Sequence, residues 1–163
     1  MIKKLETLSA AVAFAEAGDF ETTRELLAEL KKKYQGRRHS IVMVANDVPI
    51  KPGLVEYAHG LASRLKCDTL FLNIFSDRRR GMKLAKKYTA GFKTLWREIA
   101  ERFRPGTAPE TVHGHAVLFG NTQDLLQEVC HAVGGVKMVI IQQKRRSETC
   151  SYDLCVPVFH FYL

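Results

Sequence analysis

Apolar positions recur at two different spacings along the chain, and the change of spacing divides it into two parts. Over residues 1–35 apolar side chains recur every three or four residues, and Gly18-Asp19 interrupts the pattern, which predicts two helices joined by a tight turn. From residue 40 onward, short apolar runs alternate with stretches of helical spacing. We therefore expect an N-terminal helical hairpin over 1–36 and an α/β domain over 37–163.

Five runs in the second part are rich in β-branched and apolar residues, as strands covered on both faces should be. They are Ser40–Ala45, Asp68–Phe75, Thr111–Phe119, Lys137–Gln142 and Val156–Tyr162. Helical spacing between the first four predicts helices over 52–65, 79–103 and 122–133. Only Gln143–Cys155 separates the last two strands, which leaves room for a short helix or a loop. The alternation predicts a three-layer α/β sandwich around a five-stranded, mainly parallel sheet.

Several of these segments resemble, in the same order, motifs of the universal stress protein family. The similar segments are Ile41–Asn46 for the opening strand, Tyr57-Ala58 and Leu61-Ala62 for the first helix, Val117–Thr122 for the strand and turn before a helix, Met138–Ile141 for the fourth strand and Val156–Val158 for the closing strand. The resemblance covers about residues 39–163 and leaves the hairpin outside. It implies a Rossmann-like (adenine nucleotide alpha hydrolase-like) sheet of order 3-2-1-4-5, a cytoplasmic location and frequent dimerisation.

Many members of that family bind ATP through a loop of the form Gly-x2-Gly-x9-Gly-Ser/Thr after the fourth strand. Glycines there let backbone N–H groups approach the phosphates. Aligned without gaps, the glycine positions hold Gln142, Arg145 and Cys155 here, and the hydroxyl position holds Val156. The connection over 143–155 is also too short for the loop and the helix that follows it in the family. We therefore expect no binding of ATP or AMP in the standard manner, and no bound cofactor.

The carboxyl ends of the strands are the usual place for a ligand in an open α/β sheet. The candidate residues of a nucleotide or anion crevice there are Asn46, Asp47, Gly120, Gln142, Lys144, Arg145 and Arg146. The aspartate that contacts the nucleotide in ATP-binding members of the family aligns with Asn46, and Asp47 lies next to it. The basic run 144–146 would hold an anion by side-chain charge in place of a glycine loop. The alternative interpretation is a solvated, charged loop.

The charge balance is basic, with 25 Lys and Arg against 17 Asp and Glu and a net charge of +8. The excess is spread over several clusters at the ends of predicted elements, and no recognition-helix, RNA-binding or zinc-finger signature accompanies it, which argues against a nucleic-acid partner. No apolar run approaches the roughly 20 residues of a bilayer span, and no signal-peptide pattern opens the chain. We expect a cytoplasmic protein with no membrane partner.

Motifs of known enzymes are missing, since no Gly-x-Ser-x-Gly, Walker loop or Gly-x-Gly-x-x-Gly occurs. His113-x-His115 places two imidazoles on one face of a strand, and Cys130, Cys150 and Cys155 are further metal-ligand types, but their spacing does not bring them together. Cys150 and Cys155 flank a short loop, where a redox pair is one interpretation. We expect no metal site and no catalytic residues.

The apolar run 156–163 predicts an edge strand, because Pro157 cannot donate to a ladder, and an apolar edge invites pairing with a second copy. The hairpin over 1–36 has two interpretations: it covers a sheet surface left bare by the missing helix, or it binds a partner protein. We hypothesise a universal-stress-protein-like module that binds or regulates in a stress response without catalysis. The alternative is a nucleotide-binding or ATP-hydrolysing stress protein with a rebuilt pocket.

Overall fold

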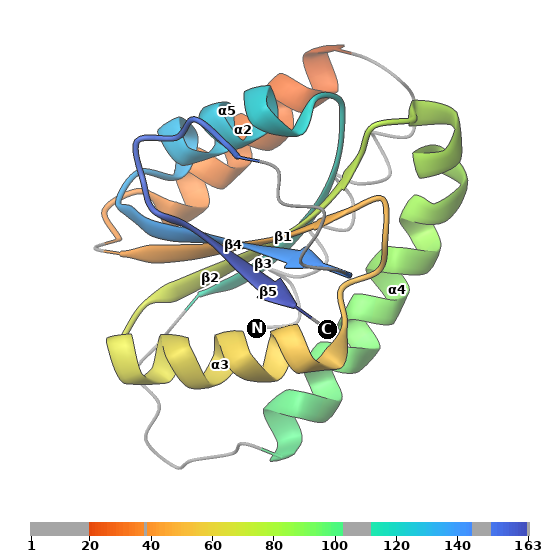
Figure 1. Cartoon of the computed structure of the whole chain (residues 1–163). Coiled ribbons are helices and arrows are strands. Elements are labelled where there is room, and N and C mark those ends of the chain that lie inside the picture. The colour runs from red at the N-terminus through yellow and green to blue at the C-terminus, as the bar shows by residue number, and fades with distance from the viewer. Residues whose placement is uncertain (1–19, 38, 103–111, 145–150, 163) are drawn as a thin grey trace.

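The computed structural model describes residues 20–37, 39–102, 112–144 and 151–162, with residues 20–23 described by their helical backbone alone. Helices and strands alternate along these ranges (Figure 1). Their bounds are α2 (Phe20–Tyr34), β1 (Ser40–Asn46), α3 (Pro52–Leu65), β2 (Asp68–Phe75), α4 (Arg78–Arg102), β3 (His113–Phe119), α5 (Thr122–Val133), β4 (Val136–Gln143) and β5 (Val158–Tyr162). The predicted succession is thereby confirmed from the second helix of the hairpin onward.

The five strands form one sheet in the order β3-β2-β1-β4-β5, and every neighbouring pair is parallel. This confirms the expected α/β class and strand order. β5 begins two residues later than predicted, because the residue before it, Pro157, contributes only its carbonyl, which accepts a hydrogen bond from the Val139 N–H at 2.9 Å. The connection from β4 to β5 contains no helix within its described part, residues 151–157.

Helices cover the sheet on both faces, which makes the three layers of the sandwich (Figure 1). On one face α3 and α4 pack on odd-numbered positions of the central strand, such as Ile41 and Met43. On the other face α2 and α5 pack on even-numbered positions such as Val42 and Val44. All four of these side chains are fully buried, as the continuously apolar sequence of β1 requires.

The helix α2 belongs to the same core as α5. Leu26, Leu30 and Tyr34 lie on one side of α2 and are at most 1% exposed, in a cluster that includes Leu70 of β2 and Leu126 of α5. Their spacing of four residues places them one above another on the helix. The second helix of the predicted hairpin is thus confirmed, and its apolar side covers the sheet. The first helix of the hairpin lies outside the described residues.

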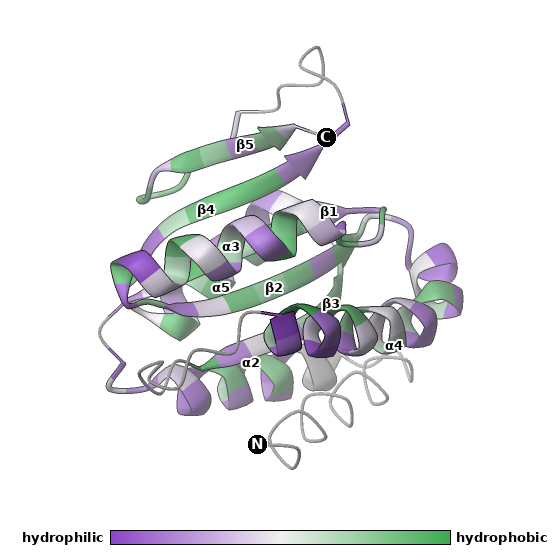
Figure 2. Cartoon of the chain, turned by 90° about the horizontal axis from the view of Figure 1, so that it is seen from below, coloured by the Kyte–Doolittle hydropathy of each residue, from purple (hydrophilic) through white to green (hydrophobic). Residues whose placement is uncertain are grey.

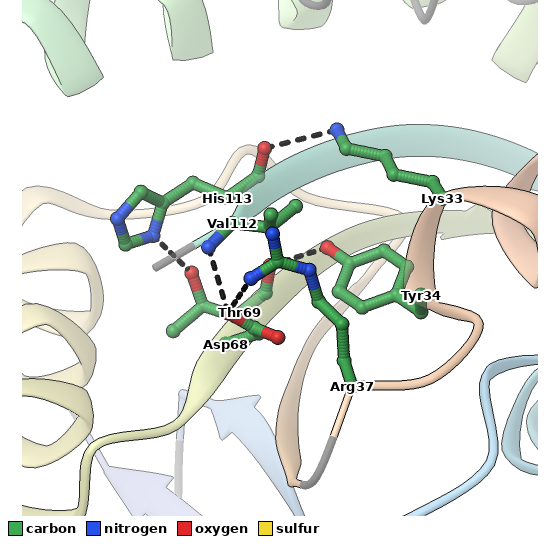
Figure 3. A network of polar contacts seen from close by, with 7 residues as sticks. All are labelled: Lys33, Tyr34, Arg37, Asp68, Thr69, Val112 and His113. Atoms are coloured by element: carbon green, nitrogen blue, oxygen red, sulfur yellow. Dashed lines mark hydrogen bonds and ion pairs between the residues drawn. The ribbon is translucent and has the colours of Figure 1, made fainter. Parts of the chain in front are cut away.

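Polar contacts fix the end of α2 to β2 and β3 (Figure 3). The Tyr34 hydroxyl donates to the Thr69 carbonyl at 2.6 Å, and the Lys33 ammonium donates to the His113 carbonyl at 3.0 Å. Just beyond the helix, Arg37 forms an ion pair with Asp68 at 3.1 Å. The Asp68 carboxylate also accepts from the Val112 N–H at 2.7 Å. The turn that follows α2 therefore carries, at Arg37, a contact that holds α2 against the sheet.

None of the helices in the described ranges combines the length and hydropathy that crossing a membrane requires.

Candidate functional site

The candidate crevice lies at the carboxyl ends of β1 and β4. In the order β3-β2-β1-β4-β5, the chain leaves β1 toward β2 and later returns past β1 to β4, so β1 and β4 flank the topological switch point. Asn46 ends β1, and Gln142 of β4 is paired with the residue before it, Ala45. The structure thus brings Asn46 and Gln142 together at the predicted place. Gly120 follows β3, with β2 and β1 between it and β4.

Both polar groups of the Asn46 side-chain amide form hydrogen bonds with neighbouring side chains. Its Oδ1 accepts from the Thr122 hydroxyl at 3.2 Å, at the start of α5, and its Nδ2 donates to the Tyr152 hydroxyl at 3.3 Å. Asn121, the residue before Thr122, caps α5: its side-chain oxygen accepts a hydrogen bond from the Asp124 N–H at 3.1 Å. Asn46 therefore ties β1 to α5 and to the 151–157 segment.

Asp47 lies in the left-handed region of backbone conformation, with φ at 53°, which aspartate tolerates better than most residues. This conformation turns the chain out of β1. The carboxylate accepts from the Ser76 N–H at 3.1 Å and from its hydroxyl at 2.9 Å, directly after β2. The carboxylate next to the position that the family resemblance places near a nucleotide is engaged here with a neighbouring turn.

Gln142 holds the loop that follows β1. Its Oε1 accepts from the Lys51 N–H at 2.8 Å, and its Nε2 donates to the Pro49 carbonyl at 3.0 Å. From the other side, the Asn73 amide of β2 donates to the Val48 carbonyl at 2.9 Å. Where the glycine loop of ATP-binding family members would begin, this chain has a glutamine whose amide pairs with backbone groups of the protein.

Tyr152 is the residue of this region that sequence reasoning missed. It comes from the β4–β5 connection, lies half-buried, and packs on the same core cluster as Leu154 and Val156 while its hydroxyl meets Asn46. The signal was present in the sequence, because Tyr152, Leu154 and Val156 alternate with polar or small residues, as one side of an extended segment should. The crevice at the switch point is therefore lined by the protein's own aromatic side chain.

The basic run after β4 is described only at its first residue. Lys144 is exposed, and Arg145 and Arg146 lie outside the described residues. Gly120 uses its N–H to bond the Phe75 carbonyl at 3.0 Å, which joins the ends of β3 and β2. The anion site suggested by the basic run remains a prediction.

A separate cluster of rings lies between α3, α4 and β3. The His113 ring is tilted against Trp96, with ring centroids 4.3 Å apart, and the His115 ring stacks on Phe92, with centroids 4.4 Å apart. Burial, followed by the charge of Lys93, lowers the pKa of His115 to about 3, while burial, His59 and Lys33 lower the pKa of His113 to about 4.

The protonation of His115 follows from its partner. The amide nitrogen of Asn73 donates to the Val48 carbonyl, so the Asn73 Oδ1 is the atom that faces His115. Because Oδ1 can only accept, the His115 Nε2, which lies 2.8 Å from it, must carry the hydrogen. The two imidazoles do lie on one face of β3, as the sequence predicted. Within the described ranges, no three His, Cys, Asp or Glu side chains form a group that could hold a metal ion.

Cys130 and Cys155 are the two candidate ligand cysteines that lie within the described residues. Cys130 lies half-buried on α5, and burial, followed by the charge of Cys155, raises the pKa of its thiol to about 11. No spacing pattern in the sequence indicates this influence of Cys155 on Cys130. Cys150, the other member of the predicted redox pair, lies outside the described residues.

No protein-family model matches the chain, and no curated protein matches it either.

Proposed function

We propose that the protein is a universal-stress-protein-like module that acts by binding or regulation, without using ATP in the manner of the ATP-binding members of that family. The proposal is supported by the strand order β3-β2-β1-β4-β5 and by the order of the similar sequence segments. It is carried by one observation: Tyr152 lies at the carboxyl end of β1, bonded to Asn46 through its hydroxyl. In an open α/β sheet this is where a nucleotide would approach.

The donors at this place favour the same proposal. A triphosphate is held by several backbone N–H groups that point into a concave loop. Here the N–H of Lys51 is paired with Gln142 and the N–H of Ser76 with Asp47. An incoming phosphate would have to displace these hydrogen bonds, each of which contributes about 0.5–1.5 kcal/mol.

Calorimetric titration of Mg-ATP and of AMP into the purified chain tests the proposal. We expect no saturable heat up to millimolar nucleotide. Binding in the micromolar range would overturn the proposal. If that binding weakened at least tenfold in Asp47→Asn and stayed unchanged in Asp77→Asn, it would support the rebuilt pocket instead. Asp77 is a matched control because it lies at the same end of the sheet, where it accepts from the Arg79 and Arg80 N–H groups at the start of α4.

We also propose that two copies of the chain pair through β5. This strand is the outer strand of the sheet, and Phe159 on it is 52% exposed. The neighbouring Phe161 ring lies 5.2 Å from Tyr57 of α3, which is 44% exposed, so the aromatic surface continues from the strand onto the helix. An apolar edge with this surface beside it suits a second, identical edge.

Sedimentation equilibrium measures this association. We expect a dimer for the natural chain and a monomer for Phe159→Lys, because pairing identical edges would bring two added charges close together. The control is Met82→Lys, which adds the same charge at an exposed position on α4. A monomeric natural chain at micromolar concentration, or a dimer unaffected by Phe159→Lys, would contradict the proposed interface.

A further inference from the structure

The described part of the β4–β5 connection runs alongside α5. The Asp153 carbonyl accepts from the amides of Gln123 and Gln127, at 2.6 and 3.2 Å, and the Asp153 N–H donates to Gln123 Oε1 at 2.9 Å. These three bonds place residue 153 beside the first two turns of α5. Leu154 and Val156 pack on the same core cluster as α5, so the contact continues past residue 153.

The segment and the helix run in the same direction. α5 starts after the carboxyl end of β3 and ends before the amino end of β4. The segment starts near the carboxyl end of β1, where Tyr152 meets Asn46, and ends where Pro157 bonds Val139 in the first half of β4. Moving forward along the segment therefore means moving forward along the helix.

This register brings Cys155 to the level of Cys130. Cys130 lies about five residues beyond the midpoint between Gln123 and Gln127, which is a distance of about 7 Å along the helix axis. From Asp153 to Cys155 is two residues, which span about 6–7 Å when extended. The two thiols thus stand at the same height on neighbouring elements. The influence of Cys155 on the pKa of Cys130 is a second sign of their closeness.

The two thiols differ in accessibility in the way that a peroxide-reactive pair requires. Cys155 is exposed, so an oxidant in solution can reach it, whereas Cys130 is partly covered by the core cluster. Both are free thiols in the structure. Burial raises the pKa of Cys130 and keeps its thiol protonated at neutral pH, which slows its reaction with an oxidant.

We propose that Cys130 and Cys155 are a modification site, a reversible disulfide formed when the chain meets hydrogen peroxide or an organic hydroperoxide. The Cys155 sulfur attacks the peroxide oxygen, the O–O bond breaks, and Cys155 becomes a sulfenic acid with release of water or an alcohol. The Cys130 sulfur then attacks the Cys155 sulfur, the S–O bond breaks, and a second water leaves. Two thiols lose two hydrogens and two electrons, and the peroxide gains them.

The bond would fix the 151–157 segment on α5, and with it Tyr152 at the end of β1. In the reduced chain the segment beside α5 is held by side-chain hydrogen bonds at exposed positions, which contribute little stability in water. Oxidation replaces this weak hold by a covalent one. The inference stands independently of the proposed function, because it concerns the thiols and holds whether or not the crevice takes a nucleotide.

Peptide mapping of the peroxide-treated chain under non-reducing conditions tests the proposal. We expect a cross-linked peptide pair joining Cys130 to Cys155, lost on addition of dithiothreitol. A Cys150–Cys155 bond, a bond between two chains, or Cys155 ending as a sulfinic acid with Cys130 unmodified would overturn the proposal. The variant with Cys67→Ala and Cys150→Ser keeps only the two proposed cysteines, and it should form the bond as fast as the natural chain does.

Thermal unfolding gives an independent measurement. Closing a loop of roughly 25 residues should raise the Tm of the oxidised chain by on the order of 5–10 °C over the reduced chain. Cys155→Ser and Cys130→Ser should each abolish this rise, while Cys67→Ala should keep it, because Cys67 lies on the opposite face of the sheet. A rise that survives in Cys130→Ser would contradict the pairing.

Discussion

At one edge of the sheet β3 lies against α2, whereas at the other edge β5 is covered only in part, where its Phe161 ring meets Tyr57 of α3. Figure 2 shows β5 at the margin of the sheet farthest from α2 and α4. β3 has five consecutive buried residues, whereas β5 has only half-buried and exposed ones. The difference shows how one sheet can have a closed edge, built for stability, and an open edge that is available for contacts.

The closed edge depends on a close approach of α2. Lys33 and Tyr34 bond carbonyls of β3 and β2, and a Cβ at Gly114 would lie 2.7 Å from the Tyr34 hydroxyl. Only a residue without a side chain leaves room for that tyrosine. Burial, followed by the charge of Asp68, raises the pKa of Tyr34, so the hydroxyl stays protonated and donates its hydrogen. A glycine on the strand and a tyrosine on the helix thus depend on each other.

The largest effect that separates the two edges should come from removing apolar volume. Leu30→Ala deletes a fully buried side chain of α2, and we expect a loss of about 2–5 kcal/mol in the free energy of unfolding. Phe159→Ala at the open edge should change it by about 0.5 kcal/mol or less in the monomer. Urea unfolding followed by circular dichroism measures both. Equal losses would show that the edges do not differ in this way.

Acid should weaken the closed edge next, because His113 and His115 belong to β3. Their pKa values in the folded chain, about 4 and about 3, lie below the unfolded value of about 6.5. Below pH 6.5 these two histidines bind protons in the unfolded chain but not yet in the folded chain, so protonation favours unfolding. The contribution of the two neutral histidines to stability is therefore full above pH 6.5 and falls as the pH drops. The slope approaches about 1.4 kcal/mol per pH unit for each histidine between pH 6 and 4.5.

Urea titrations at successive pH values measure this slope. The facing groups named above, His59, Lys33 and Lys93, all carry or gain positive charge and act in the same direction. His113→Gln should reduce the slope by about half, since one of the two histidines no longer titrates. A slope that is unchanged in this variant would mean that the acid sensitivity arises elsewhere.

Gly114→Ala should have the smallest of the three effects on the closed edge. The added methyl must push the Tyr34 hydroxyl from the Thr69 carbonyl, and we expect a loss of about 1–3 kcal/mol. In a Tyr34→Phe background the hydroxyl is gone, so the same change should cost clearly less. Gly91→Ala is the control, because a Cβ there meets nothing within 4 Å and a helix interior gains about 0.5–1 kcal/mol from it. Additive losses would refute the coupling.

Local patterns were sufficient to predict most of the elements. The sequence prediction for Thr122–Val133 matches α5 at both ends, since Asn121 caps its start and Gly134, with φ at 63°, follows its end. β2 is likewise predicted at both ends, because its eight residues form one buried run and the polar pair Ser76-Asp77 follows it. Such signals lie within or next to the element that they define.

Placement across the sheet was not predictable from such signals. The position of α2 depends on contacts such as Lys33 to His113, which are 80 residues apart. The candidate site shows the same limit. Asn46 and Gln142 were placed correctly, because both end predicted parallel strands, but their partners Tyr152 and Lys51 come from connections whose path no local pattern describes. Polar residues at strand ends predicted where the candidate site lies, and long-range packing determined which hydrogen-bond partners its side chains have.

The distance along the chain between α2 and its partners has a consequence for synthesis. α2 leaves the ribosome before any strand, but its Tyr34 must wait for Thr69, and its Lys33 for His113, before the closed edge exists. Until β3 and α5 have emerged, the core cluster that covers Leu26, Leu30 and Tyr34 is incomplete, which leaves this side of α2 open to chaperones and proteases. Because α2 is synthesised long before the elements that it packs against, we expect the nascent chain to be most susceptible to proteolysis while the segment between α2 and β3 is translated.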